Sequence, residues 1–317
     1  MLDIDQINNV MALYGRWYKG MFICERDMAV CPSNKAPKEL TYGNFSGNAL
    51  WKQTEFTNSS YYDVPGTRIS PWAVHIRGFH ILTMFEDIMH NLHLGILRDL
   101  EASVMVAIAV IYGCENLDAN LRLMYVDFRQ WAKSHKLSYA RRRFTEKLVG
   151  VTDAGGYPCM SSFVKAATIK VILAFLADKT WNDSSSEEAR VRSTCVWAVA
   201  NFLHILDTSE FWLTSAQAHE AAHSARTFLL LYQKLAVSAL ESGLCLYKVR
   251  PKHHYFEHTG DDVERSHMNP AYFHCFMAED YIGRNARLAS KTHRWTVSLR
   301  TLERNMIVLR QRWKAKL

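Results

Sequence analysis

The chain has 317 residues, of which 49% are hydrophobic and 22% are charged, and its formal net charge is +7. This composition is typical of a globular protein that buries one large core or two smaller ones, and it argues against extensive disorder outside residues 32–65 and 182–188. The longest strictly apolar run, Val104 to Tyr112, is far shorter than the roughly 20 residues that a membrane-spanning helix needs, so no membrane span is expected.

In chain order, the first predicted element is an irregular covering segment, residues 1–69. It is rich in Asn, Ser, Gly, Tyr and Trp and has no sustained periodicity. Alternating bulky residues predict an extended stretch between Ser70 and Met89. From Gly95 the apolar spacing becomes helical and predicts a helix that ends near Gly113.

The remainder of the chain is predicted to be mainly helical. Apolar spacing and capping signals predict helices at Asp118–His135, Ser161–Lys179, Ser185–Leu206 and Ser215–Ser242, and two final helices that begin near Met277 and Trp295. Leu246–Phe256 is predicted to be extended. We therefore expect residues 70–317 to form a mainly α region, with a helical bundle-like body and a few short strands.

Seven cysteines are scattered along the chain without a Cys-x-x-Cys pair. We expect reduced thiols, most of them in the core. Cys24 and Cys31 lie close enough in sequence to form a local disulfide or to share a metal ion, and this alternative is kept open.

Positive charge is concentrated at the end of the chain. Between Tyr281 and Leu317, ten Lys and Arg residues and two tryptophans accompany a single acidic residue. Such a segment suits a polyphosphate surface, although a solvated helix face with two core tryptophans has the same composition. The predicted DNA-binding residues are Arg284, Arg287, Lys291, Arg294, Arg300 and Arg304.

A different chemistry is suggested by His219-Glu220-Ala221-Ala222-His223, which satisfies the His-Glu-x-x-His pattern. On a helix, this spacing directs two imidazoles to one Zn²⁺ and leaves the glutamate as general base of a hydrolase. The nearest downstream carboxylate at the familiar spacing, Glu241, would lie about 27 Å along the same helix from His223. A third ligand would have to come from elsewhere; otherwise the motif is an ordinary polar helix face.

The segment Val249–His258 is dense in histidine. His253, His254 and His258 are the candidates for that third zinc ligand, or for a metal site of their own. The alternative for each is a buried imidazole that is hydrogen-bonded to the backbone.

Three short motifs follow one another in the chain: Asp87-Ile88-Met89-His90, Pro251-Lys252-His253-His254, and Phe276-Met277-Ala278-Glu279. Together they resemble eukaryotic cut-and-paste DNA transposases of the DDE type, particularly the CACTA-like group. The resemblance covers roughly Ser70 to Arg304. It implies a helical insertion within an RNase H-like core, of which the predicted strands would be a remnant.

The same resemblance implies a catalytic site. Such enzymes hold two Mg²⁺ ions about 4 Å apart with three carboxylates and use them to cut and join DNA. Glu279 matches the third carboxylate, Asp87 and His90 match an accessory pair that supports the Mg²⁺ site, and His253, His254 and His258 are supporting residues. None of the aspartates before Asp87 lies in an apolar strand pattern, so the first two carboxylates have no match.

Two interpretations follow from the resemblance. The chain is either a partial or domesticated transposase with Mg²⁺-dependent DNA cleavage and strand transfer, or a non-catalytic DNA-binding or interaction protein in which Glu279 only stabilises the start of a helix. The zinc hydrolase is a weaker third choice. In the first two cases we expect an intracellular, nuclear protein that binds DNA and no membrane, and self-association is left open.

Overall fold

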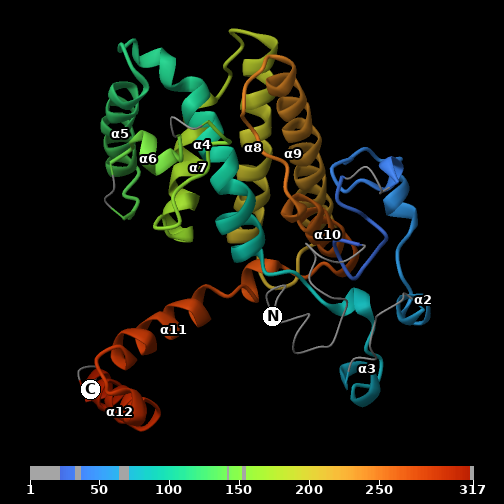
Figure 1. Cartoon of the computed structure of the whole chain (residues 1–317), viewed down its shortest axis with the longest axis vertical. Coiled ribbons are helices and arrows are strands. Elements are labelled where there is room, and N and C mark those ends of the chain that lie inside the picture. Colours follow the sequence, from blue (N-terminus) through green and yellow to red (C-terminus); the bar gives the residue numbers. More distant parts are fainter. Residues whose placement is uncertain (1–21, 33–36, 64–70, 141–142, 152–154, 315–317) are drawn as a thin grey trace. The chain divides into compact units, whose positions relative to one another are not determined.

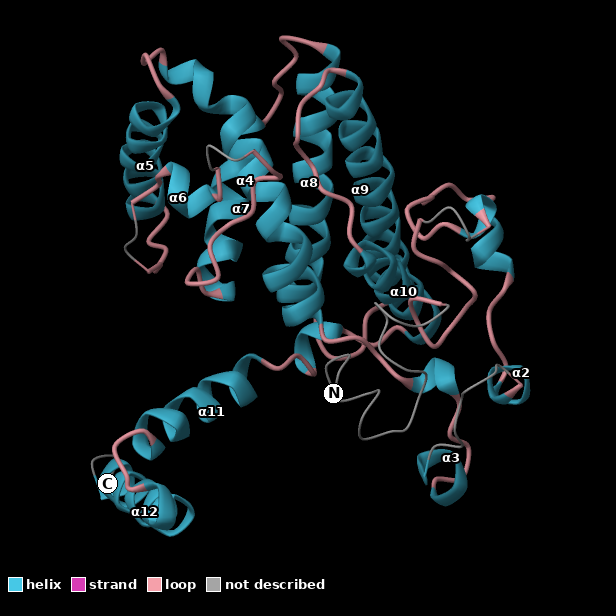
Figure 2. Ribbon diagram, viewed as in Figure 1, coloured by secondary structure: helices cyan, strands magenta, loops and turns pink. Residues whose placement is uncertain are grey.

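The structure is a computed structural model that describes residues 22–32, 37–63, 71–140, 143–151 and 155–314. It is mainly helical (Figure 2), as the sequence predicts. The predicted short strands, and with them the remnant of an RNase H-like core, are wrong for the described residues, which form two isolated bridges, Val30 with Thr41 and Trp212 with Met268, but no strand. The chain divides into two compact units, Met1–Phe273 and His274–Leu317.

The first unit holds most of the helices (Figure 1). They are α2 (Asn58–Tyr62), α3 (Pro71–His75), α4 (Leu97–Ile108), α5 (Leu117–Ser134), α6 (Glu146–Val149), α7 (Ala166–Thr180), α8 (Glu187–Thr208), α9 (Ser215–Glu241) and α10 (Pro251–Ser266). A π-helical segment, Met89–Ile96, leads directly into α4, which ends in a 3₁₀ turn closed by Gly113 in the left-handed conformation. The second unit consists of α11 (Phe276–Ala289) and α12 (Val297–Lys314).

Side-chain caps explain several of the helix starts. The Asn116 side chain accepts a hydrogen bond from Ala119 N at the start of α5, and Ser186 caps α8 in the same way. Thr214 and Gln217 form a reciprocal capping box at the start of α9. The predicted helices from Asp118 onward are thereby confirmed within a few residues of their expected ends.

Two predicted extended stretches are wrong. Between Ser70 and Met89 the described residues form α3 and a 3₁₀ turn at Ile81–Thr83. Leu246–Phe256 becomes helical at Pro251, because proline has a fixed φ that suits the first turn of a helix and the Arg250 backbone N–H donates to His253 Nδ1 at 3.1 Å. His254 and His258, four residues apart, therefore lie on the same helix face.

The core of the first unit lies between α4, α7, α8, α9 and α10. The aromatic ring of Phe256 on α10 packs edge-on against Phe202 of α8 and Phe228 of α9, with ring centroids 5.1 and 5.8 Å away. A smaller apolar cluster joins the irregular segment that precedes α2 to the other side of α10, through Trp51 and Tyr255. The N-terminal described residues thus cover α10. No helix among the described residues has the length and apolarity needed to cross a membrane.

Glu101 on α4 is fully buried, and neither of its carboxyl oxygens has a hydrogen-bond partner among the described residues. Burial raises the pKa of this carboxyl well above its usual value. The folded state therefore keeps the proton that the unfolded state releases near pH 4.3, a typical value for glutamate, so stability falls as the pH rises above about 4.3.

We expect Glu101→Gln, which removes this ionisation, to raise the free energy of unfolding by about 1–3 kcal/mol near pH 8 and to flatten its fall between about pH 5 and 8. Urea unfolding at several pH values measures both effects. The matched control is Glu115→Gln at an exposed position, which should change stability by less than about 0.5 kcal/mol. Equal pH profiles for the wild type and Glu101→Gln would contradict the expectation.

Candidate functional site

The Asp-x-x-His motif forms a closed turn at the start of the π-helical segment. Asp87 is buried, and its Oδ1 accepts a hydrogen bond from Met89 N at 3.1 Å. Its other oxygen is hydrogen-bonded to Nδ1 of His90, whose side chain is one third exposed. The aspartate therefore orders its own turn and holds the imidazole in place.

This turn is in contact with the Pro-Lys-x-His segment at the start of α10. The Lys252 ammonium donates a hydrogen bond to His90 O at 2.7 Å. The Asn91 amide donates to Lys252 O at 2.9 Å and accepts from Phe256 N at 3.0 Å. Gly95 permits this close approach, because a Cβ at that position would lie 2.6 Å from Lys252 Cδ. Two motifs that are about 160 residues apart in the sequence thus form one local structure.

Glu279, the predicted third carboxylate, lies in the first turn of α11. Its backbone N donates to Cys275 O at 2.8 Å. Asp87, His90 and His258 belong to the first unit, whereas Glu279 belongs to the second. Their convergence around Mg²⁺ therefore stays a prediction.

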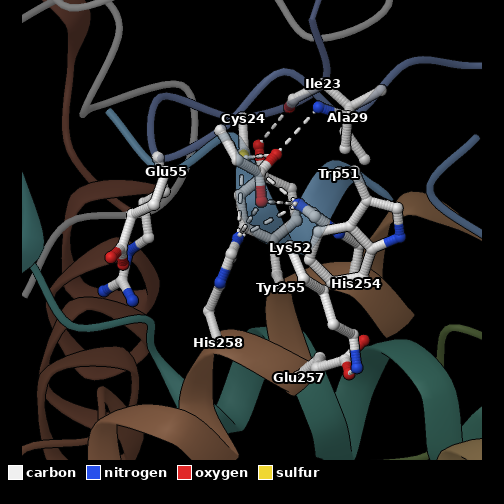
Figure 3. A network of polar contacts seen from close by, with 12 residues as sticks. Ile23, Cys24, Ala29, Trp51, Lys52, Glu55, His254, Tyr255, Glu257 and His258 are labelled. Carbon is white, nitrogen blue, oxygen red and sulfur yellow. Dashed lines mark hydrogen bonds and ion pairs between the residues drawn. The ribbon is translucent and has the colours of Figure 1, made fainter. Parts of the chain in front are cut away.

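A different set of side chains does converge, inside the first unit. Cys24, Asp27, His254 and His258 bring four potential metal ligands close together. Figure 3 shows Cys24, His254 and His258 of this group. All four are buried, with exposed fractions of 3%, 2%, 0% and 7%. The two histidines come from consecutive turns of α10, and Cys24 and Asp27 come from a bend within the N-terminal covering segment.

The ligand atoms are close to one another. Cys24 Sγ lies 3.2 Å from His254 Nε2 and 3.6 Å from His258 Nε2, and these two nitrogens are 3.0 Å apart. Asp27 Oδ2 lies 3.3 Å from each nitrogen, and Oδ1 lies 3.3 Å from the sulfur. Because the donors are a thiol, a carboxylate and two imidazoles, this arrangement can hold a transition-metal ion.

Neighbouring side chains fix these four groups in position. The Trp51 ring packs edge-on against both imidazoles, with centroids 4.4 Å from His254 and 6.2 Å from His258. Ala29 N donates to Asp27 Oδ1 at 2.9 Å and orients the carboxylate. The Trp51 ring therefore packs against the imidazoles, and the Ala29 backbone N–H holds the carboxylate.

Burial and neighbouring charges shift the pKa values of Cys24 and Asp27. Burial raises the pKa of the Cys24 thiol well above its usual value, and the Asp27 carboxylate raises it further. Burial also acts to raise the pKa of Asp27, but the facing imidazoles outweigh burial and hold that pKa well below its usual range. The site therefore contains a buried carboxylate beside a thiol that only a nearby cation would ionise.

A buried ion pair attaches the same segment to α10 one turn further along. The Arg26 guanidinium donates to both oxygens of Asp262, at 2.9 and 2.7 Å, and also to Met84 O. Burial and the neighbouring Glu25 raise the pKa of Glu86, which is also close to Arg26, to about 8. Arg26 therefore compensates mainly the charge of Asp262.

The His-Glu-x-x-His motif lies on α9, which continues unbroken to Glu241. His219 Nδ1 lies 3.1 Å from a carboxylate oxygen of Glu264, and Glu220 accepts a hydrogen bond from the Asn201 amide. Among the described residues, neither His219 nor His223 belongs to a group of three converging ligands. The described part of the chain thus offers no third zinc ligand for a hydrolase.

The histidines of α10 have separate roles. His253 is fully buried, its Nδ1 accepts from Arg250 N at 3.1 Å, and burial lowers its pKa to about 3, so it is a neutral backbone-bonded imidazole. His254 and His258 instead belong to the four-residue cluster.

Sequence reasoning missed Cys24 and Asp27 as the partners of His254 and His258. The signal that could have found them is the Cys-x-x-Asp spacing, which presents two ligands from one turn.

Comparison with known protein families, curated proteins and solved structures found no match to this chain.

The Arg26–Asp262 pair leads to a stability prediction. We expect Asp262→Asn to lower the free energy of unfolding by about 3–5 kcal/mol, because it leaves the buried Arg26 charge uncompensated. The neighbouring Asp261→Asn, which removes only an exposed ion pair with Arg226, should cost about 0–1 kcal/mol. Urea unfolding compares the two, and similar costs would show that the buried pair does not hold the N-terminal segment on α10.

Proposed function

We propose that this chain is a transposase-derived DNA-binding protein that contacts DNA through its second unit, His274–Leu317. The observation that carries the proposal is the distribution of charge. Ten of the 38 Lys and Arg residues but only three of the 31 Asp and Glu residues lie in this unit. That leaves 28 of each sign in residues 1–273, so the second unit accounts for the whole net charge of +7.

The side chains of the second unit support a role in binding an extended anion. Neither α11 nor α12 contains a buried residue. Among the described residues, Arg284 pairs with Asp280 and Arg300 with Glu303, but the other cations of this unit form no ion pair. Most of its cations are therefore available for phosphate groups, each of which would release counterions on binding.

The tryptophans of this unit are exposed rather than part of a core. Trp295 is 79% exposed and Trp313 is 69% exposed. The Arg294 guanidinium lies over the Trp295 ring, 5.0 Å from its centroid. An exposed indole beside an arginine offers a stacking surface for nucleic-acid bases as well as a phosphate contact.

Support for the transposase origin comes from the first unit. The Asp-x-x-His turn and the Pro-Lys-x-His segment, which carry two of the three motifs of the resemblance, are joined through Lys252 and His90. The described residues lack the strands on which the first two carboxylates of such enzymes stand. We therefore place DNA binding, rather than strand cleavage, at the centre of the proposal.

Duplex DNA affinity should fall steeply with salt. If about six phosphates are contacted, the affinity should fall about a thousandfold between 50 and 200 mM salt. Fluorescence anisotropy at several salt concentrations measures the slope of log K against log salt. Weak binding that does not change over this range would remove the basis of the proposal.

Two triple variants, one in each unit, test whether the DNA-binding surface lies in the second unit. Arg287→Gln, Arg310→Gln and Arg312→Gln together should reduce that slope by about three, since each lost phosphate contact accounts for about one. The control, with the same change in net charge, is Arg122→Gln, Arg190→Gln and Lys234→Gln, three exposed cations of the first unit. Equal effects of the two triples would show that only the total charge matters.

Catalysis has its own test. If the transposase chemistry is retained, the protein nicks DNA in the presence of Mg²⁺, and Glu279→Gln abolishes nicking because it removes a metal ligand. The adjacent Asp280→Asn is the control and should keep the activity. Nicking that survives Glu279→Gln would reject the role assigned to Glu279, and a protein that binds DNA without nicking it would fit the non-catalytic interpretation.

A further inference from the structure

We propose that Cys24, Asp27, His254 and His258 bind one Zn²⁺ ion as a four-coordinate structural site. The site lies in the first unit and involves none of the residues proposed to contact DNA. The inference is therefore independent of the proposed function.

The positions of the ligand atoms match a tetrahedron around zinc. With Asp27 Oδ2 as the carboxylate ligand, the five separations that involve a histidine nitrogen range from 3.0 to 3.6 Å, and the other carboxylate oxygen, Oδ1, lies 3.3 Å from the sulfur. The usual zinc bonds, 2.3 Å to sulfur and 2.0–2.2 Å to nitrogen or oxygen, require separations of about 3.3–3.6 Å at tetrahedral angles. The four groups thus need to move by only a few tenths of an ångström.

Hydrogen bonds alone do not account for this arrangement. His254 Nε2 and His258 Nε2 each have three polar neighbours at 3.0–3.6 Å, namely each other, the thiol and the carboxylate. A ring nitrogen carries either one proton or one lone pair, so it can make only one well-formed hydrogen bond. One central cation would satisfy all four groups at once.

The donor set selects zinc. Thiolate and imidazole are preferred by Zn²⁺, whereas Mg²⁺ and Ca²⁺ prefer oxygen ligands throughout. With Cys24 as thiolate, Asp27 as carboxylate and both histidines neutral, the charges of the ligands cancel the charge of the ion. A neutral complex is the form that a buried site can hold at the lowest desolvation cost.

Burial of all four ligands indicates a structural rather than a catalytic ion. A catalytic zinc keeps one position for water or substrate, whereas a structural zinc is closed by four protein ligands. Here the protein supplies all four, and Trp51 covers both imidazoles. The ion would therefore fasten the N-terminal covering segment to α10, beside the Arg26–Asp262 pair.

Elemental analysis of the purified full chain tests the site directly. We expect about one zinc per wild-type chain, and loss of most of that zinc in Cys24→Ser and in His258→Gln. The matched controls are Cys31→Ser, a nearby half-buried cysteine, and His219→Gln in the His-Glu-x-x-His motif, and both should keep their zinc.

Cobalt substitution of the wild-type chain provides a test that does not depend on folding of the ligand variants. Zinc is removed with a chelator and Co²⁺ is added. Tetrahedral coordination with one thiolate predicts a thiolate-to-cobalt charge-transfer band in the near ultraviolet, and Cys31→Ser should show the same band. Limited proteolysis should cut residues 22–63 faster after chelation and more slowly again after Zn²⁺ is restored.

Three results would overturn the inference. The first is a wild-type chain that contains no zinc and takes up neither Zn²⁺ nor Co²⁺. The second is a cobalt spectrum without a thiolate band. The third is full zinc content in Cys24→Ser and His258→Gln with loss in His219→Gln, which would assign the metal to α9.

Discussion

The structure depends on the burial of α10, a helix rich in polar residues. From His253 to Gly260 every residue of this helix is buried, and Asp262 and Val263 extend the buried stretch. Phe256 faces α8 and α9, and Gly260 lies so close to α9 that an added Cβ would be 3.2 Å from the Ala225 Cβ. The remaining faces carry imidazoles and carboxylates, which are costly to bury unless each finds a partner.

The covering segment supplies those partners. Arg26 compensates Asp262, Lys52 pairs with Glu257, and Cys24 and Asp27 face the histidine pair. On another side of the helix, Lys252 ties α10 to the turn that contains Asp87 and His90. The same helix thus connects the helical body, the N-terminal segment and the Asp-x-x-His turn, so the residues singled out for chemistry in the first unit are positioned together.

The sequence predicts helices whose buried face is apolar, but it does not predict α10, whose buried residues are largely polar. The helices α5, α8 and α9 are predictable because each has apolar residues at helical spacing and a recognisable cap, whereas α7 has the spacing alone. α10 was predicted to be extended at its start because its buried face is made of polar groups, so no apolar stripe marks it. Asp27 and Cys24 are not recognisable as ligands of His254 and His258, because these partners are more than two hundred residues away and the Cys-x-x-Asp spacing says nothing of where its partners lie. The charge imbalance of the second unit, in contrast, needs no tertiary information and was evident from the sequence.

The distance along the chain between the covering segment and α10 has a consequence for biosynthesis. The helices from α4 to α9 contact near neighbours in sequence and can form in the order in which they are translated. Cys24, Arg26 and Asp27 meet their partners only after α10 has been made, and until then Trp51 lacks its contacts with His254 and His258. Although this segment is made before the helical body, it is therefore among the last parts of the first unit to dock, and its apolar side chains need protection from aggregation until then.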